Sequence, residues 1–281
     1  MSNKIEVGVL GATGMVGQQF ILQLAGHPWF EVTWLGASER SIGKKYRDIE
    51  WHLSSQMPDE VTDLVIESVE SDLAPRLLFS ALDSSVAGDV EEMHAKNGRI
   101  VVSNAGNHRM DPTVPLLVPE INSDHLNLLN VQQEAKRWSG AIVTNPNCST
   151  VFLAMVLGAL RQFKPTAAFV TTLQAASGAG YPGVSSVDLL GNVVPNIAGE
   201  ADKLESEPQK ILGTLNQGVI QVHPIVISAQ TFRVPVINGH TEAISVRFAD
   251  NPDESEVLSA FRDFFGMPQV FELPSAPQNP I

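Results

Sequence analysis

Cysteine is almost absent from this sequence, since Cys148 is the only one in 281 residues. A single cysteine cannot form an intrachain disulfide, which is typical of proteins from reducing compartments. Long apolar runs are absent too, because no stretch reaches the roughly 18 residues that a membrane-spanning helix needs. The opening residues, MSNKIEVGVLG, show no basic segment followed by an apolar signal core. We therefore expect a cytoplasmic protein with no membrane association.

Positive charge is also scarce. The chain has 18 lysines and arginines against 31 acidic residues, so its formal net charge is -13. Such a surface repels the phosphates of nucleic acids, and no nucleic-acid partner is expected. The histidines and acids show no ligand spacing typical of zinc, so no metal site is expected. Apolar residues make up 43% of the chain and are spread along it, which indicates a globular protein of one or two domains.

The first structural signal is a glycine-rich turn, GATGMVG, between the apolar run at 5–10 and a helical pattern at 15–26. The run is typical of a buried parallel strand. Gly11, Gly14 and Gly17 permit a tight turn and close approach of a pyrophosphate, and a helix N-terminus attracts negative charge. The spacing is GxxGxxG rather than GxGxxG, so a close-packed turn without a ligand is the alternative. We favour a nucleotide site.

The second predicted strand, EVTWLGAS at 31–38, indicates which dinucleotide binds. An NAD site usually ends this strand with an acidic residue that bonds the ribose 2′-hydroxyl. Here the strand ends at Ser38, and hydroxyls and cations follow, with Glu39 among them. These groups suit a 2′-phosphate, so the sequence favours NADP; the candidates are Ser38, Arg40, Ser41, Lys44 and Lys45. A solvated loop with ordinary lysines is the alternative.

Three more strands are predicted at 77–82, 99–105 and 141–147, with a helix at 87–98 between the first two. Alternating strands and helices indicate a parallel sheet, and ligands bind beyond the carboxyl ends of its strands. The residues that follow the strands are therefore site candidates: Ser84, Ser85, Asn104 and Arg109. The predicted fold is α/β, with a Rossmann-like parallel sheet followed by a second α+β domain.

Cys148 follows the last of these strands and precedes the apolar run TVFLAMVLGALRQF, which predicts a buried helix. Asn147 or Ser149 can cap that helix. A thiol at a helix N-terminus is expected to have a stabilised thiolate, which is the nucleophilic form. Inert packing is the alternative for a lone cysteine, but its place at the end of a strand favours catalysis.

A catalytic thiol needs a proton-transferring partner, and His240 is the candidate. The segment TFRVPVINGHTEAISV places it at a turn that enters an alternating strand, seven residues after Arg233. We interpret this segment as a hairpin-like element whose ends hold the two side chains. An arginine there would bind a carboxylate, while the histidine would move protons.

Taken in order, seven motifs resemble those of the aspartate-β-semialdehyde dehydrogenases: GATGMVG, SNAGNHRM, LLVPEIN, TNPNCST, LQAASGAGYPG, GEADKLESE and RVPVINGHT. They cover nearly the whole chain, and the ordered set is more specific than any single motif. The form NPNCST is similar to the archaeal and fungal branch, which also contains malonyl-CoA reductases. The resemblance implies NADP-dependent interconversion of L-aspartyl-4-phosphate and L-aspartate-4-semialdehyde, in the biosynthesis of lysine, methionine, threonine and isoleucine.

The resemblance also implies a role for each matching residue. Cys148 matches the nucleophile that forms a thioacyl enzyme, His240 the acid/base residue, Gln174 a substrate-orienting residue, and Asn147 a support for the thiol and oxyanion. Expected substrate contacts are Arg233 for the α-carboxylate, Glu200 for the amino group, and Arg109 and Lys203 for the phosphate, with Asn104 as a further candidate. Expected cofactor contacts are Gly11, Thr13, Gly14, Met15, Val16, Ser38, Arg40, Ser41, Ser84, Ser85, Gly178 and Gly180.

Without the resemblance, the later motifs have plain explanations. GEADKLE is an ordinary solvated helix start, Gln174 a residue paired within a sheet, and SGAGYPG only an unusual backbone path. Two other functions stay open: a malonyl-CoA reductase that uses the same thiol and histidine, and a catalytically inactive oligomerising homologue. N-acetylglutamyl-phosphate reductase is less favoured, because the sequence around its cysteine usually differs from NPNCST.

The predicted domains are an NADP-binding domain at 1–147 and a catalytic and dimerisation domain at 148–281. By resemblance the expected partners are the small-molecule substrate, inorganic phosphate and further copies of the chain, as a homodimer or homotetramer. The family's chains continue beyond the proline-rich stretch MPQVFELPSAPQNPI, with further strands and a last helix that completes the cofactor pocket. We therefore expect a complete catalytic set and a weakened affinity for the cofactor.

Overall fold

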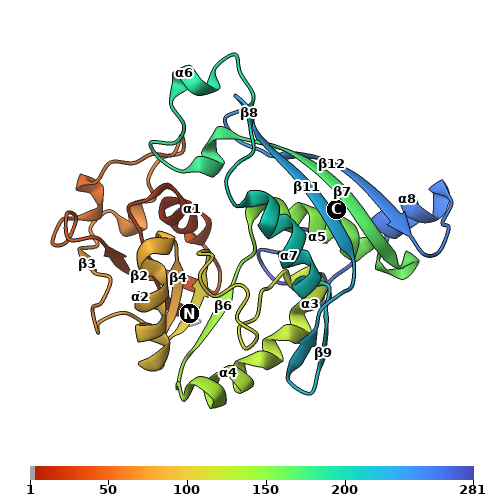
Figure 1. Cartoon of the computed structure of the whole chain (residues 1–281). Helices are drawn as coiled ribbons and strands as arrows, with labels where there is room; N and C mark the ends of the chain where they lie inside the picture. Colours follow the sequence, from red (N-terminus) through yellow and green to blue (C-terminus); the bar gives the residue numbers. More distant parts are fainter. Residues whose placement is uncertain (1–3) are drawn as a thin grey trace. The chain divides into compact units, whose positions relative to one another are not determined.

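The computed structural model describes residues 4–281, which form two compact units (Figure 1). The first unit holds the described residues up to Pro115 together with Asn127–Asn145, and the second holds Leu116–Leu126 and Pro146–Ile281. The predicted division after residue 147 remains a prediction, and the short segment 116–126 belongs to the second unit although it precedes that point. Among the described residues, no helix has the length and apolar character needed to cross a membrane.

The first unit is built on a six-stranded sheet in the order β3-β2-β1-β4-β5-β6, in which every pair of neighbours is parallel. The chain therefore starts in the middle of the sheet, moves to one edge and returns to extend the other. The carboxyl ends of β1 and β4 lie at this change of direction, where such sheets bind ligands. Its elements are β1 (Ile5–Leu10), α1 (Met15–Leu24), β2 (Phe30–Ala37), η1 (Tyr46–Asp48), η2 (Asp59–Val61), β3 (Ile66–Ser68), β4 (Leu77–Ser80), α2 (Ser84–Lys96), β5 (Ile100–Ser103), α4 (Leu128–Lys136) and β6 (Ala141–Thr144).

Both faces of the parallel sheet are buried. Val9 of β1 packs with Ile21 of α1 in one apolar cluster, whereas the next residue, Leu10, packs with Leu78 and Ile142 in another. Successive side chains of a strand point to opposite faces, so apolar residues at consecutive positions require cover on both sides. Each of these side chains is fully buried, which contributes about 1.5–3 kcal/mol apiece relative to exposure.

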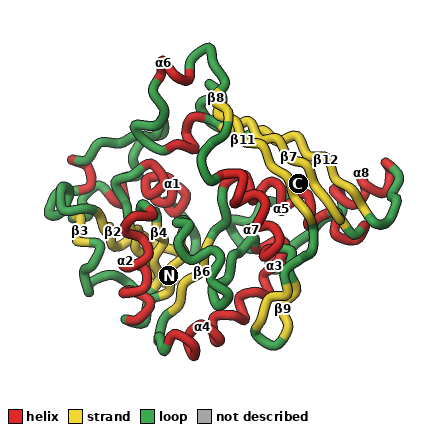
Figure 2. Tube along the Cα trace, in the orientation of Figure 1, coloured by secondary structure: helices red, strands yellow, loops and turns green. Residues whose placement is uncertain are grey.

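The second unit contains a four-stranded mixed sheet in the order β12-β7-β11-β8. β11 is parallel to β7, while β12 pairs antiparallel with β7 and β8 pairs antiparallel with β11. Figure 2 shows β7, β11 and β12 side by side. The elements of this unit are α3 (Pro119–Asn122), η3 (Ser123–Asn127), α5 (Cys148–Ala159), η4 (Arg161–Phe163), β7 (Pro165–Gln174), η5 (Ala176–Ala179), α6 (Ser186–Leu189), β8 (Val194–Pro195), α7 (Glu200–Ile211), β9 (Thr214–Asn216), β10 (Val219–Gln221), β11 (Val226–Arg233), β12 (Thr241–Phe248), α8 (Glu254–Arg262) and α9 (Met267–Val270).

Within the second unit, helices pack on one face of the mixed sheet. Leu153 of α5 and Leu204 of α7 pack with Val170 of β7 in the apolar core of this unit. The alternate residues of the sheet form an exposed face, on which Phe169 is 60% and Val226 is 68% accessible. A parallel sheet followed by a second α+β unit confirms the predicted fold class.

The predicted hairpin between Arg233 and His240 is wrong. Arg233 ends β11 and His240 precedes β12, but these two strands do not pair, because β7 lies between them and pairs with both. The connection instead passes over the end of β7, where the carbonyl groups of Val236 and Ile237 accept hydrogen bonds of 2.7 and 3.1 Å from the segment that follows the strand. The expected convergence of the arginine and the histidine is nevertheless present, on the two sides of β7.

Candidate functional site

The glycine-rich turn of the first unit is tightly packed. Gly11 has a φ of +73°, and a Cβ on it would lie 2.6 Å from the Ala81 carbonyl oxygen. A Cβ on Gly17 would lie 2.2 Å from the Gly11 carbonyl oxygen, so α1 can approach the turn only without a side chain there. The N–H groups of Gly11 and Ala12 both donate to the carbonyl of Gly36, at 2.8 and 3.1 Å. These contacts anchor the turn to β2.

The carbonyl groups of the same turn are bonded to buried side chains. The Tyr46 hydroxyl donates to the Ala12 carbonyl at 2.6 Å, and Gln18 Nε2 donates to the Thr13 carbonyl at 3.3 Å. Burial raises the pKa of Tyr46 far above its ordinary value, so it stays a donor. The first turn of α1 has neither a side-chain cap from Gly14 nor an acidic residue. Its free N–H groups and the helix dipole therefore fit an anionic group such as a dinucleotide pyrophosphate.

The end of β2 carries the candidates for the 2′-phosphate. Ser38 and Arg40 are exposed, and the Ser41 N–H donates to the Ser38 carbonyl at 2.9 Å, which forms a turn directly after the strand. Lys45, also considered for this role, instead pairs with Asp63 at 2.9 Å. Two other candidates for cofactor contact, Met15 and Val16, lie at the start of α1, where Val16 is 44% exposed and Met15 is half-buried.

The ends of β4 and β5 hold the other candidates of this unit. Ser84 and Ser85 are exposed at the start of α2, which Asp83 caps by accepting a 2.9 Å hydrogen bond from the Ser85 N–H. Arg109 is buried, and its Nη2 donates to the Asn104 carbonyl at 2.8 Å. The strand order thus brings these residues to the same edge as the glycine turn, as parallel strands require.

In the second unit, Cys148 and His240 are in direct contact. Cys148 is the first residue of α5 and is exposed, and its Sγ lies 3.2 Å from His240 Nε2. His240 Nδ1 accepts a hydrogen bond of 3.0 Å from the N–H of Ala175. Because a backbone N–H can only donate, Nδ1 carries no proton, and the hydrogen of the neutral ring lies on Nε2 and points toward the sulfur.

The substrate-free site holds a thiol rather than a thiolate. Although part of Cys148 is accessible to solvent, the protein atoms around its sulfur desolvate the thiolate. This desolvation and the negative charge of Glu200 raise the pKa of Cys148, while the N–H groups of Ser149 and Cys148 and the charge of Arg233 act in the opposite direction. The expectation of a lowered thiol pKa is therefore wrong for this form: the helix N-terminus contributes as predicted, but burial and the carboxylate outweigh it. Burial and the Arg233 charge lower the pKa of His240, so its ring is neutral.

Asn147 and Glu200 are two polar residues that are hydrogen-bonded to each other beside the thiol. Asn147 caps α5, since its Oδ1 accepts hydrogen bonds from the N–H groups of Ser149 and Thr150 at 3.0 and 3.4 Å. Its Nδ2 donates to Glu200 Oε2 at 2.8 Å. The amide of Asn147 is therefore engaged at both ends, and it connects the start of α5 with the start of α7.

Glu200 is also bonded to Lys203 and Gln174. Lys203 Nζ lies 2.7 Å from Glu200 Oε1, and Gln174 Nε2 donates to Glu200 Oε2 at 3.3 Å. Burial alone would raise the pKa of Glu200, but the bonds from Lys203 and Asn147, the Lys203 charge and the bond from Gln174 lower it below its ordinary value. Glu200 is thus a carboxylate at neutral pH, and Gln174 is tied to it as well as to its sheet.

Arg233 completes the group of sequence-predicted residues in this unit. It is 5% exposed, its Nη1 donates to the Ala175 carbonyl at 2.7 Å, and its Nε is buried without a hydrogen-bond partner. A Cβ on Gly178 would lie 2.7 Å from Arg233 Nη1 and 3.1 Å from His240 Cε1, so a side chain at this position would displace the Arg233 guanidinium. Gly180 has a φ of +72° but no close neighbour. A cationic side chain with an unused donor suits a carboxylate ligand.

Two acidic residues near this group were not identified from the sequence. Glu207 accepts a hydrogen bond of 2.7 Å from the Asn147 N–H, and a spacing of seven residues from Glu200 on one helix was the available signal. Glu242 lies two residues after His240, and burial raises its pKa to about 7. Its carboxyl group is buried beside the Ser149 hydroxyl, whose hydrogen bond lowers the pKa of Glu242 but does not offset the effect of burial. No sequence signal distinguishes this carboxyl from other strand glutamates.

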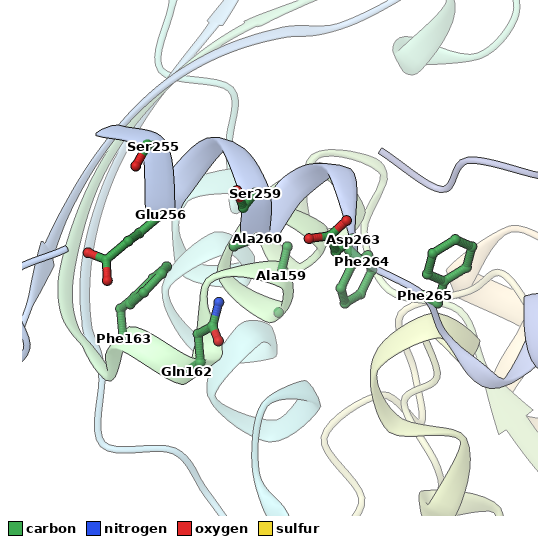
Figure 3. Close-up of a pocket in the computed structure, with 11 residues that line it drawn as sticks. Ala159, Gln162, Phe163, Ser255, Glu256, Ser259, Ala260, Asp263, Phe264 and Phe265 are labelled. Carbon is green, nitrogen blue, oxygen red and sulfur yellow. The ribbon is translucent and has the colours of Figure 1, made fainter. Parts of the chain in front are cut away.

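A hollow of about 640 Å³ lies elsewhere in the second unit, between the end of α5, η4 and α8. Figure 3 shows Gln162 and Phe163 on one side of the hollow, and Ser259 of α8 and Asp263, the residue that follows this helix, on the other. None of the sequence-predicted site residues lines this hollow. Across residues 4–281, no group of three or more histidine, cysteine or acidic side chains could hold a metal ion.

The chain matches known proteins along nearly its whole length. Residues 6–129 match the family model "Semialdehyde dehydrogenase, NAD binding domain", and residues 157–280 match "Semialdehyde dehydrogenase, dimerisation domain". An aspartate-semialdehyde dehydrogenase of Archaeoglobus fulgidus is 46% identical over 99% of this chain and 80% of its own length. That of Cryptococcus neoformans is 48% identical, also over 99% and 80%.

Solved structures agree with these relatives. The enzyme of Candida albicans, crystallised with NADP, has a TM-score of 0.90 at 42% identity, over 99% of this chain and 81% of its own. A Vibrio cholerae enzyme at 23% identity shares the fold, with a TM-score of 0.76. The chain spans about 80% of the length of the archaeal and fungal relatives. On these matches the chain belongs to the aspartate-semialdehyde dehydrogenase family, close to its archaeal and fungal members.

Proposed function

We propose that this protein catalyses the reversible, NADP-dependent reduction of L-aspartyl-4-phosphate to L-aspartate-4-semialdehyde, with Cys148 as the nucleophile. The observation that carries the proposal is the 3.2 Å contact of the Cys148 sulfur with His240 Nε2 at the start of α5, in a chain of this family. The name of the relatives supports the substrate, and the NADP in the Candida albicans structure supports the cofactor. No observation favours malonyl-CoA or an inactive homologue.

In the first step the Cys148 thiolate attacks the acyl carbon of aspartyl phosphate. A carbon–sulfur bond forms, the carbon–oxygen bond to the phosphoryl group breaks, and phosphate leaves with the electron pair. Arg233 is proposed to bind the α-carboxylate and Glu200 the α-amino group. Lys203 is a proposed phosphate ligand, and Arg109 of the first unit retains the same proposed role. Asn147 and Gln174 hold the Glu200 carboxylate in place, through hydrogen bonds of 2.8 and 3.3 Å.

Substrate binding itself favours ionisation of the thiol. The charge of Glu200 is one of the two main causes that raise the pKa of Cys148. An ammonium group bound to Glu200 would offset that charge, so the pKa of the thiol falls when the substrate arrives. The thiol proton goes to solvent, because the two nitrogens of the neutral His240 ring are already occupied by a hydrogen and by the Ala175 N–H.

In the second step the thioester is reduced, and NADPH supplies the hydride when it is bound. The Nε2–H of His240 is placed to donate to the oxygen that becomes negatively charged, and the collapse of this intermediate releases the aldehyde and the Cys148 thiolate. The proposed ligands of the cofactor's phosphates are the open N–H groups at the start of α1, the exposed Arg40 and the half-buried Ser41.

The proposal is tested by measuring NADPH formation from L-aspartate-4-semialdehyde, NADP and inorganic phosphate. The absorbance of the reduced nicotinamide at about 340 nm follows the reaction. We expect turnover that depends on phosphate and falls by at least ~10³-fold in Cys148→Ala, because the nucleophile is lost. Turnover that is independent of phosphate, or that survives the substitution, would contradict the proposal. Activity with malonyl-CoA alone would support the rival substrate.

The second unit matches a dimerisation domain, so the protein forms oligomers, and its substrates are small molecules. Within that statement we propose a homodimer or homotetramer, with inorganic phosphate as the co-substrate in the oxidative direction. The product semialdehyde would serve the synthesis of lysine, methionine, threonine and isoleucine. A cytoplasmic location stays a prediction from the sequence.

A further inference from the structure

Glu207 is a buried carboxylate on α7 that the proposed reaction does not use. Its residue is 2% exposed, and its Oε2 accepts a hydrogen bond of 2.7 Å from the backbone N–H of Asn147. Asn147 immediately precedes Cys148 and caps α5. Glu207 therefore acts on the backbone that leads into the nucleophile and not on the thiol itself.

Asn147 is held through three different groups. Its backbone N–H donates to Glu207, its Nδ2 donates to Glu200 at 2.8 Å, and its Oδ1 accepts from the first N–H groups of α5 at 3.0 and 3.4 Å. Since each bond restrains a separate part of one residue, the turn before Cys148 has little freedom to move. The position of that turn decides whether Sγ reaches His240 Nε2, and a displacement of about 1 Å can lower a catalytic rate by roughly 100-fold.

The same face of α7 carries all three side chains that serve this region. Glu200, Lys203 and Glu207 follow one another at intervals of three and four residues, which places them along one side of a helix. Between them, Leu204 is fully buried in the apolar core of the unit, which fixes the rotation of the helix. The helix thus presents two proposed substrate ligands together with the carboxylate that restrains Asn147.

From this geometry we propose that Glu207 is a positioning residue: it holds the turn at Asn147 so that the Cys148 sulfur meets His240 Nε2. Its kinetic consequence rests on the proposed function, whereas its effect on the reactivity of the thiol does not. Removal of the Glu207 acceptor leaves the Asn147 N–H buried without a partner, so the turn must shift to reach another acceptor.

The chain offers a matched control on the same helix. Glu205 Oε1 accepts a hydrogen bond of 3.0 Å from the backbone N–H of Ala229, in the middle of β11. Glu205→Ala therefore removes the same kind of bond from α7 as Glu207→Ala does. The residue that loses its acceptor, Ala229, is not one of the proposed site residues. A purely structural effect of losing such a bond should appear in both variants.

The experiment compares Glu207→Ala, Glu207→Gln, Glu207→Asp and Glu205→Ala with the wild-type chain. It measures kcat and KM for phosphate-dependent oxidation of L-aspartate-4-semialdehyde, the rate of Cys148 alkylation by iodoacetamide, and the melting temperature. We expect Glu207→Ala to lower kcat by on the order of 10- to 100-fold with little change in KM, and to slow alkylation several-fold. Glu207→Gln retains an acceptor at the same reach and should recover most of both rates. The shorter Glu207→Asp should not, and Glu205→Ala should keep both rates.

Wild-type kcat and alkylation in Glu207→Ala would overturn the proposal. So would equal losses in Glu207→Ala and Glu205→Ala, or a failure of Glu207→Gln to recover more than Glu207→Asp. If Glu207→Ala does not fold, the comparison of the Gln and Asp variants decides. If the wild-type chain shows no turnover with the semialdehyde, the proposed function fails, while the alkylation rates still test the role of Glu207.

Discussion

The contact between Cys148 and His240 depends on which nitrogen of the imidazole carries the hydrogen. Ala175 donates its N–H to Nδ1 at 3.0 Å, so a doubly protonated ring would bring two N–H groups face to face. Burial and the charge of Arg233 also lower the pKa of His240. The residues therefore form a neutral hydrogen-bonded pair and not an imidazolium–thiolate pair. In the proposed reaction, His240 would therefore donate to an oxyanion, and the thiol would depend on the bound substrate for its activation.

Glu242 makes stability depend on pH. Its pKa is about 7 in the folded chain against an ordinary value of 4.5, so between these values the folded form binds more protons than the unfolded form, and stability falls as pH rises. A shift of this size corresponds to roughly 3 kcal/mol. Glu242→Gln mimics the protonated acid, so we expect it to raise the free energy of unfolding by up to about 3 kcal/mol at pH 8 and by under about 1 kcal/mol at pH 5.

Urea unfolding of both proteins at the two pH values measures the difference. Glu39→Gln, at an exposed glutamate, is the control and should give no comparable gain at pH 8. An equal effect of Glu242→Gln at both pH values would show that the side chain is not protonated in the folded chain.

At the scale of secondary-structure elements, the close approach of α1 to the turn after β1 decides which positions of that turn require glycine. Gly17 faces the Gly11 carbonyl at a distance that excludes a Cβ, whereas a Cβ on Gly14 would lie 3.6 Å from the same oxygen, in ordinary contact. The two glycines therefore serve different purposes. Gly17 allows the helix to pack, and Gly14 keeps the helix N-terminus uncovered.

This difference predicts that two similar substitutions destabilise the protein to different extents. Gly17→Ala should lower the free energy of unfolding by about 1–3 kcal/mol, because helix α1 must move away from the turn. Gly14→Ala should cost less than about 1 kcal/mol, the usual difference at a helix N-cap. Thermal unfolding followed by circular dichroism measures both. A Gly14→Ala protein as destabilised as Gly17→Ala would contradict this account of the turn.

At the scale of the whole molecule, the exposed face of the mixed sheet matches the assignment of this region to a dimerisation domain. The helices α5 and α7 cover one face, while Phe169, Leu173 and Val226 are at least 40% exposed on the other. Large apolar side chains that are exposed on one face of a sheet are typical of a protein interface. The same strands that hold Gln174 and Arg233 therefore also offer a surface to a second copy of the chain.

Phe169→Asp should weaken self-association by at least ~30-fold, since an unpaired charge replaces an aromatic anchor on that face. Leu73→Asp is the control, because Leu73 is an apolar residue that is 75% exposed and belongs to the first unit, not to the mixed sheet. Sedimentation velocity over a range of concentrations measures the association, and circular dichroism checks that both variants fold. An unchanged dimer in Phe169→Asp would exclude this face as the interface.

Some features of the site follow from local sequence. Gly11 and Gly17 mark the turn because only glycine fits there, and Cys148 lies at a helix start because an apolar run follows a strand and an asparagine cap. Other features do not. The pKa of the Cys148 thiol depends on burial and on the charge of Glu200. Glu200 is 52 residues after Cys148 in the sequence, and the packing of α5 on α7 brings the two residues together.

The sequence by itself determined the parallel sheet, the order of the motifs and the chemical types in the site, because these depend on periodicity, turn residues and caps within short segments. The tertiary structure alone decided how the segments combine. It inserted β7 between the strands of Arg233 and His240, set the tautomer of His240 through Ala175, and brought Glu207 to the backbone of Asn147. Hydrogen bonds and pKa values respond to neighbours in space, and those neighbours are distant in the chain.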